Sequence, residues 1–142
     1  MLKGLDPLLG PDLLHALRAM GHGDEIAIVD GNYPADADAE RLIRLDGHGA
    51  VRVVTAVLSV MPLDREVDEA VFHPLTAMPQ QVHADMTAAV RALEPHAGIA
   101  ALAGQAFYDR VKSAYCIIAT SEPRLYGNIV LRKGVIQPAD TR

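Results

Sequence analysis

A histidine flanked by two glycines is the residue of this sequence best suited to move protons. His22 stands between Gly21 and Gly23, and a mostly apolar run that ends at Asp30 follows. An imidazole donates or accepts a proton near neutral pH, and a carboxylate holds or deprotonates a hydroxyl. In open α/β sheets, ligands bind beyond the carboxyl ends of the strands, which is where Asp30 is expected. We therefore predict an acid–base role for His22 and a ligand-binding role for Asp30.

A second stretch with binding chemistry is Tyr126-Gly127-Asn128, near the C-terminus. Asn128 offers both donors and an acceptor for a sugar hydroxyl, and Tyr126 offers a ring face and a phenol. Gly127 would let the backbone approach a ligand closely. The pattern alone leaves a structural alternative open. Asp-Gly-Asn at 30–32 and Tyr-Gly-Asn at 126–128 are also sequences typical of turns. A histidine in a loop such as His22 can likewise be simply solvated.

Other chemical signatures are weak in this sequence. There is no HExxH motif, Cys/His cluster, G-x-S-x-G elbow or phosphate-binding glycine loop, so we predict neither a metal nor a cofactor. The histidines expected at the surface are His15, His48, His83 and His96. His73, between Phe72 and Pro74, remains ambiguous.

The bulk composition excludes several classes of protein. A chain of 142 residues is long enough for one domain, which we expect to cover residues 1–142. The net charge of -5 and the lack of a basic cluster argue against nucleic-acid binding. No apolar run approaches the roughly 20 residues of a membrane-spanning helix, and no signal peptide is evident, so a cytoplasmic location is expected. The single cysteine, Cys116, lies in an apolar run and is expected to be buried and inert.

Helical and strand patterns alternate along the chain and must position these residues. Pro11 suits a first helical turn, and Pro74 can stand only at an edge or the end of a strand. The expected helices are 11–20, 50–61, 82–93 and 106–113, and the expected strands are 25–30, 42–45, 70–75, 99–103, 115–120 and 129–131. Such alternation predicts a single α/β domain with a central, largely parallel sheet flanked by helices.

The motifs also support a family resemblance over nearly the whole chain. They are Met-Gly-His-Gly-Asp-Glu at 20–25, Phe-Tyr at 107–108, Tyr-Gly-Asn-Ile at 126–129 and Leu-Arg-Lys-Gly-Val at 131–135. In this order and spacing the sequence resembles the ribose pyranase and fucose mutarotase family (RbsD/FucU), and within it the L-fucose mutarotase branch. Residues 34–98 match more loosely.

The resemblance implies an RbsD-like fold and a cofactor-free isomerase that interconverts the α and β anomers of a pyranose monosaccharide such as L-fucose. His22 matches the family's catalytic histidine, and Asp30, Tyr126, Gly127 and Asn128 match its sugar-binding residues. Members form homo-oligomers, commonly decameric rings (homodecamers) with sites at subunit contacts.

One position departs from the family pattern. Fucose mutarotases usually carry an arginine three residues before the Phe-Tyr pair, and Gly104 stands there in this chain. Loss of those fixed donors would weaken or redirect the recognition of hydroxyls. Two alternatives remain open: a ribose pyranase, which interconverts pyranose and furanose forms as in the sister branch of the family, and, because the arginine is missing, a monosaccharide-binding protein without turnover.

Overall fold

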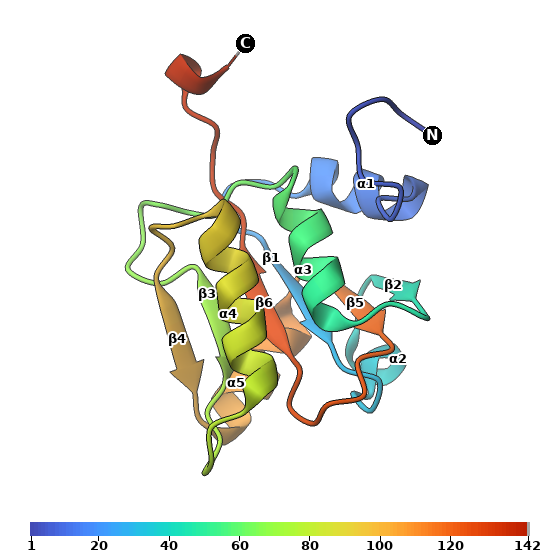
Figure 1. Ribbon diagram of the computed structural model, residues 1–142, viewed down its shortest axis with the longest axis vertical. Helices are drawn as coiled ribbons and strands as arrows, with labels where there is room; N and C mark the ends of the chain where they lie inside the picture. The colour runs from blue at the N-terminus through green and yellow to red at the C-terminus, as the bar shows by residue number, and fades with distance from the viewer. Residues whose placement is uncertain (142) are drawn as a thin grey trace.

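The computed structural model describes residues 1–141 and contains one sheet of six strands with helices on both faces (Figure 1). The strands are β1 (Glu25–Val29), β2 (Leu42–Leu45), β3 (Val71–Pro74), β4 (Ile99–Leu102), β5 (Cys116–Thr120) and β6 (Ile129–Arg132). The helices are α1 (Pro11–Ala19), α2 (Ala35–Asp38), α3 (Ala50–Leu58), α4 (Gln81–Leu93) and α5 (Gly104–Ser113), followed by a 3-10 turn at Pro138–Asp140. The prediction of a single α/β domain is confirmed.

Strand order and direction decide which strand ends lie together at each edge of the sheet. The order is β2-β5-β1-β6-β3-β4, with β2, β5 and β1 mutually parallel and β3 parallel to β4. Only β6 runs antiparallel, and it separates β1 from β3. Because Ile28 pairs with Ile129, the residues that precede β6 lie beside the residues that follow β1.

The central strand β1 is buried on both faces, which explains its continuous apolar run. Ile26 and Ile28 pack into a core formed with α1, α3 and α4, whereas Ala27 and Val29 face a second core formed with α2 and α5. Phe107 on α5 fills that second core and is fully buried. Two packed layers thus hold β1 rigidly and fix the positions of the residues at both of its ends.

The predicted elements are confirmed with small differences at their ends. Helix α3 ends at Leu58, three residues before the predicted end, because Pro62 disfavours helical backbone just before it. The single-turn helix α2 was not predicted, since four residues are too few to show a helical period. Cys116 is buried as expected, and burial raises the pKa of its thiol to about 11. Within residues 1–141, every helix is too short or too polar to cross a bilayer.

Candidate active site

A hollow of about 250 Å³ lies at the edge of the sheet where β1 ends. Its walls are Asp30, Asn32, Tyr33, Pro34, Tyr108, Leu125, Tyr126 and Asn128. This volume is slightly below the range of about 300–1,000 Å³ usual for drug-sized ligands, so the hollow suits a small molecule. The wall residues include a carboxylate, amides and phenols but no lysine or arginine. The hollow therefore offers hydrogen bonds to a neutral ligand rather than a counter-charge to an anion.

Asp30 and Asn128 hold one another at the base of this hollow. The backbone N–H of Asp30 donates to Asn128 Oδ1 at 2.7 Å, and Asp30 Oδ1 accepts from the backbone N–H of Asn32 at 2.9 Å. Both side chains are buried. Among residues 1–141, neither Asp30 Oδ2 nor the Asn128 amide nitrogen has a hydrogen-bond partner. One acceptor and one donor group are therefore left for the hydroxyls of a ligand.

Three tyrosines form the sides of the hollow. Tyr33 donates its hydroxyl to Asp38 Oδ2 at 2.8 Å, and burial together with that carboxylate raises the pKa of its phenol. Tyr108 and Tyr126 are exposed, and within the described chain their phenols have no partner. Tyr108 was not predicted as a site residue. A signal was available, because successive helical residues point in different directions, so the buried Phe107 leaves Tyr108 exposed.

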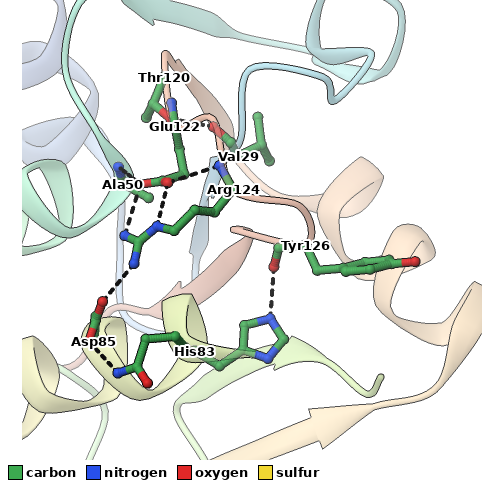
Figure 2. A network of polar contacts seen from close by, with 9 residues as sticks. Val29, Ala50, His83, Asp85, Thr120, Glu122, Arg124 and Tyr126 are labelled. Carbon is green, nitrogen blue, oxygen red and sulfur yellow. Dashed lines mark hydrogen bonds and ion pairs between the residues drawn. The ribbon is translucent and has the colours of Figure 1, made fainter. Parts of the chain in front are cut away.

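The loop between β5 and β6, which carries Tyr126, is fixed by a buried carboxylate (Figure 2). Glu122 accepts from the backbone N–H of Ala50 at 3.1 Å, and its other oxygen accepts from Arg124 Nε at 2.7 Å. These hydrogen bonds, that from Arg124 foremost, hold the pKa of Glu122 below its ordinary value. Arg124 also bonds Asp85 on α4 at 2.6 Å. The loop is thereby tied to the starts of both α3 and α4.

At the tip of this loop, the backbone of Tyr126 adopts a φ of 63°, which non-glycine residues rarely adopt. Its carbonyl accepts from His83 Nε2–H at 2.7 Å (Figure 2). The prediction that His83 lies at the surface is wrong: the residue is 7% exposed, because it lies on the face of α4 that packs under this loop. Gly127 does not line the hollow, but a side chain there would press on Glu122 and Val82, so glycine allows this close approach.

His22 lies at the opposite end of β1 and is paired with a carboxylate that sequence reasoning did not identify. Its Nε2 is 3.1 Å from Asp64 Oδ2, which also accepts from Arg132 Nε at 2.9 Å. Burial alone would raise the pKa of Asp64, but hydrogen bonds from Arg132, from the backbone N–H of Glu66 and from His22 hold it below its ordinary value. The side chain of His22 remains 43% exposed. It is therefore anchored at one nitrogen and open to a partner at the other.

A single chain does not bring the predicted site residues together. Asp30, Tyr126 and Asn128 share the hollow, whereas His22 is separated from it by the length of β1, about 20 Å between residues 24 and 30 at the usual strand rise. Arg110 does not replace the arginine missing at Gly104, because it is bonded to Glu25 and stacked on Phe72. No cluster of three metal-ligating side chains occurs within residues 1–141.

Comparison with known proteins decides the family. A model of the RbsD / FucU transport protein family matches residues 3–136. The chain belongs to this RbsD/FucU family. An L-fucose mutarotase of Glaesserella parasuis is 41% identical over 95% of this chain and 96% of its own. The crystal structure of FucU from Bifidobacterium longum has a TM-score of 0.90 at 34% identity, covering 95% of this chain and 100% of that one. The structure of a Streptococcus pneumoniae fucose mutarotase in complex with L-fucose has a TM-score of 0.85 at 37% identity, covering 96% and 100%.

In this RbsD/FucU chain, Gly134 follows β6 and packs closely against the backbone of Leu63 and Asp64. A Cβ atom at Gly134 would overlap the carbonyl oxygen of Leu63. Gly134→Ala is therefore expected to push Asp64 away from His22 and to lower the free energy of unfolding by about 1–3 kcal/mol. Urea denaturation followed by circular dichroism measures this loss.

The matched control is Gly21→Ala at the same end of the molecule. Its Cβ would meet only Asp24 Oδ2 at 3.7 Å, an ordinary contact. The free energy of unfolding should then change by less than about 1 kcal/mol in either direction. Equal effects of the two substitutions would contradict a special requirement for glycine at 134.

Proposed function

We propose that this chain is a cofactor-free mutarotase that interconverts the α and β anomers of L-fucose or a closely related pyranose. The observation that carries the proposal is the hollow at the end of β1, where Asp30 and Asn128 present polar atoms that have no partner among residues 1–141, beside the exposed phenols of Tyr108 and Tyr126. Support also comes from the 37% identity to a protein whose structure contains L-fucose. The lack of a cationic wall residue favours a neutral monosaccharide over a sugar phosphate.

Mutarotation opens and recloses the sugar ring, and it needs proton transfers at two oxygen atoms but no redox change. A proton leaves the anomeric hydroxyl, another reaches the ring oxygen, and the bond between the anomeric carbon and the ring oxygen breaks to give the open-chain aldehyde. Rotation of the aldehyde and closure on its other face reverse these transfers. In the proposed mechanism His22 exchanges the proton, while Asp30, Asn128 and the Tyr126–Gly127 turn hold the remaining hydroxyls. Positioned acid–base groups contribute about 10²–10⁴-fold to such steps.

Asp64 supports this role by fixing the orientation and tautomer of His22. A carboxylate only accepts hydrogen bonds, so the Nε2 atom of His22 that faces Asp64 carries a proton. In the neutral ring, Nδ1 is then the free base. It is the atom that we assign to proton exchange with the sugar.

The separation of His22 from the hollow within one chain leads to the proposal of a shared site. In a homo-oligomer, the exposed imidazole of one protomer would enter the hollow of its neighbour, which supplies Asp30, Tyr126 and Asn128. A decameric ring with sites at subunit contacts is the assembly that we propose. Neither part of the site would catalyse exchange alone.

Exchange NMR tests the activity directly. A magnetisation-transfer experiment on L-fucose, other 6-deoxy sugars and D-ribose measures anomer exchange with and without the protein. Accelerated α–β exchange of a 6-deoxy hexose is the expected result. Faster appearance of furanose signals from ribose would instead favour the pyranase alternative. Saturation transfer from protein to sugar without faster anomer exchange would indicate a sugar-binding protein and would refute the mutarotase function.

A further inference from the structure

The carbonyl oxygen of Tyr126 is the point at which α4 holds the tip of the sugar-binding loop. It accepts two hydrogen bonds of 2.7 Å, one from the backbone N–H of Asn128 and one from His83 Nε2–H. The first closes a tight turn around Gly127. The second joins that turn to a helix 43 residues earlier in the chain. Both lone pairs of this carbonyl are therefore engaged, which supports the strained backbone of Tyr126.

The state of the His83 ring is determined by its surroundings. Burial, opposed by the hydrogen bond to Tyr126, lowers the pKa of His83, so the ring is neutral at pH 7. Because a carbonyl only accepts, the single proton of this neutral ring must be on Nε2. The ring packs against that of His73, with centroids 4.3 Å apart, and His73 is itself held by a hydrogen bond from Nδ1 to the carbonyl of Pro74 at 3.0 Å. His83 therefore has one orientation and one tautomer.

The loop has other anchors besides the bond from His83, and one of them, the hydrogen bond from the backbone N–H of Asp30 to Asn128 Oδ1, lies at the hollow itself. Glu122 and Arg124 fix its first half to α3 and α4 (Figure 2). Within residues 1–141, His83 provides the one side-chain hydrogen bond to the backbone of the turn formed by Tyr126, Gly127 and Asn128. A loss of this bond would leave a partly buried carbonyl with one donor fewer and release the strained residue.

We propose that His83 is a positioning residue for sugar recognition, whose Nε2–H fixes the turn that presents the Tyr126 phenol and the Asn128 amide to the hollow. The proposal rests on the mutarotase function proposed above. It assigns His83 no contact with the sugar. Its effect should therefore fall on binding rather than on the proton-transfer step, because the hydroxyls are held in both the ground state and the transition state.

A matched pair of substitutions tests the hydrogen bond. Methionine and glutamine have similar length and helix propensity, but only glutamine can donate to the carbonyl of Tyr126. His83→Met is expected to raise the KM for L-fucose in exchange NMR about tenfold with kcat little changed, which is the usual effect of one lost hydrogen bond. His83→Gln is expected to keep the KM within about threefold of the original protein. His96→Met, at an exposed position, should change neither value.

The outcomes separate this inference from the proposed function. If the unmodified protein accelerates no sugar in the panel, the mutarotase function fails and the role of His83 fails with it. If it is active and His83→Met retains the original KM, only the His83 inference is overturned. An equal rise in both His83 variants also overturns it, since the donor would then be irrelevant.

A measurement on the unmodified protein covers the case in which His83→Met does not fold. With ¹⁵N-labelled histidine, the Nε2–H signal of His83 should be protected from solvent exchange and should shift on saturation with L-fucose. The signal of the exposed His96 should do neither. A His83 signal that exchanges as rapidly as that of His96 would overturn the inference.

Discussion

His22→Ala is expected to lower the rate of L-fucose anomer exchange by about 10²–10⁴-fold, the contribution of a positioned acid–base group. The fold should survive the change. The side chain of His22 is 43% exposed, and its partner Asp64 keeps the hydrogen bonds from Arg132 and from the backbone of Glu66. A large loss of rate with an unchanged unfolding midpoint therefore assigns the effect to chemistry.

The control for this substitution is His15→Ala, which removes an exposed imidazole from α1. Alanine is the best helix former, so α1 should be retained and the exchange rate should stay at its original value. Exchange at the original rate in His22→Ala would exclude His22 as the proton-transfer group. The hollow itself, with its two exposed phenols, would then have to contain the catalyst.

Two impaired variants should regain activity when they assemble together. Asp30→Asn removes a carboxylate acceptor from the hollow and is expected to reduce exchange by about 10–100-fold, while Oδ1 of the new amide still accepts from Asn32. Oligomers that mix Asp30→Asn chains with His22→Ala chains combine an intact imidazole on one protomer with an intact hollow on its neighbour. In a random equal mixture, about a quarter of the sites contain both intact parts, given one equivalent contact per protomer.

Co-expression of the two chains with different affinity tags isolates such mixed oligomers for exchange NMR. Activity near a quarter of the original value is expected, above that of either variant alone. The control is a simple mixture of the separately purified, pre-assembled variants, which should show only the average of the two parental activities while subunits do not exchange. Mixed oligomers with only the average of the parental activities would contradict a site shared between protomers.

Much of the site's chemistry could be predicted from short stretches of neighbouring residues. The apolar run before Asp30 is long enough to cross a sheet buried on both faces, so the position of Asp30 at the carboxyl end of β1 followed from local pattern. The glycines around His22 likewise indicated a loop, which the structure has before β1. The helices and strands themselves could be predicted because apolar periodicity is a property of neighbouring residues.

Contacts between distant segments could not be predicted in the same way. Asn128 lies beside Asp30, 98 residues earlier, only because β6 runs antiparallel next to β1. The pairing of His22 with Asp64 and the burial of His83 under the loop before β6 depend on the same packing. A lone histidine or aspartate in a sequence gives no sign of which segment will cover it.

The sequence by itself therefore determined the order of the strands and of the longer helices, the family, and the residue types that can move a proton or hold a hydroxyl. The tertiary structure alone decided that Asp30, Tyr126 and Asn128 share one hollow, with His22 a strand's length away. Local patterns report which face of an element is buried, whereas strand order and direction come from the packing of the whole chain.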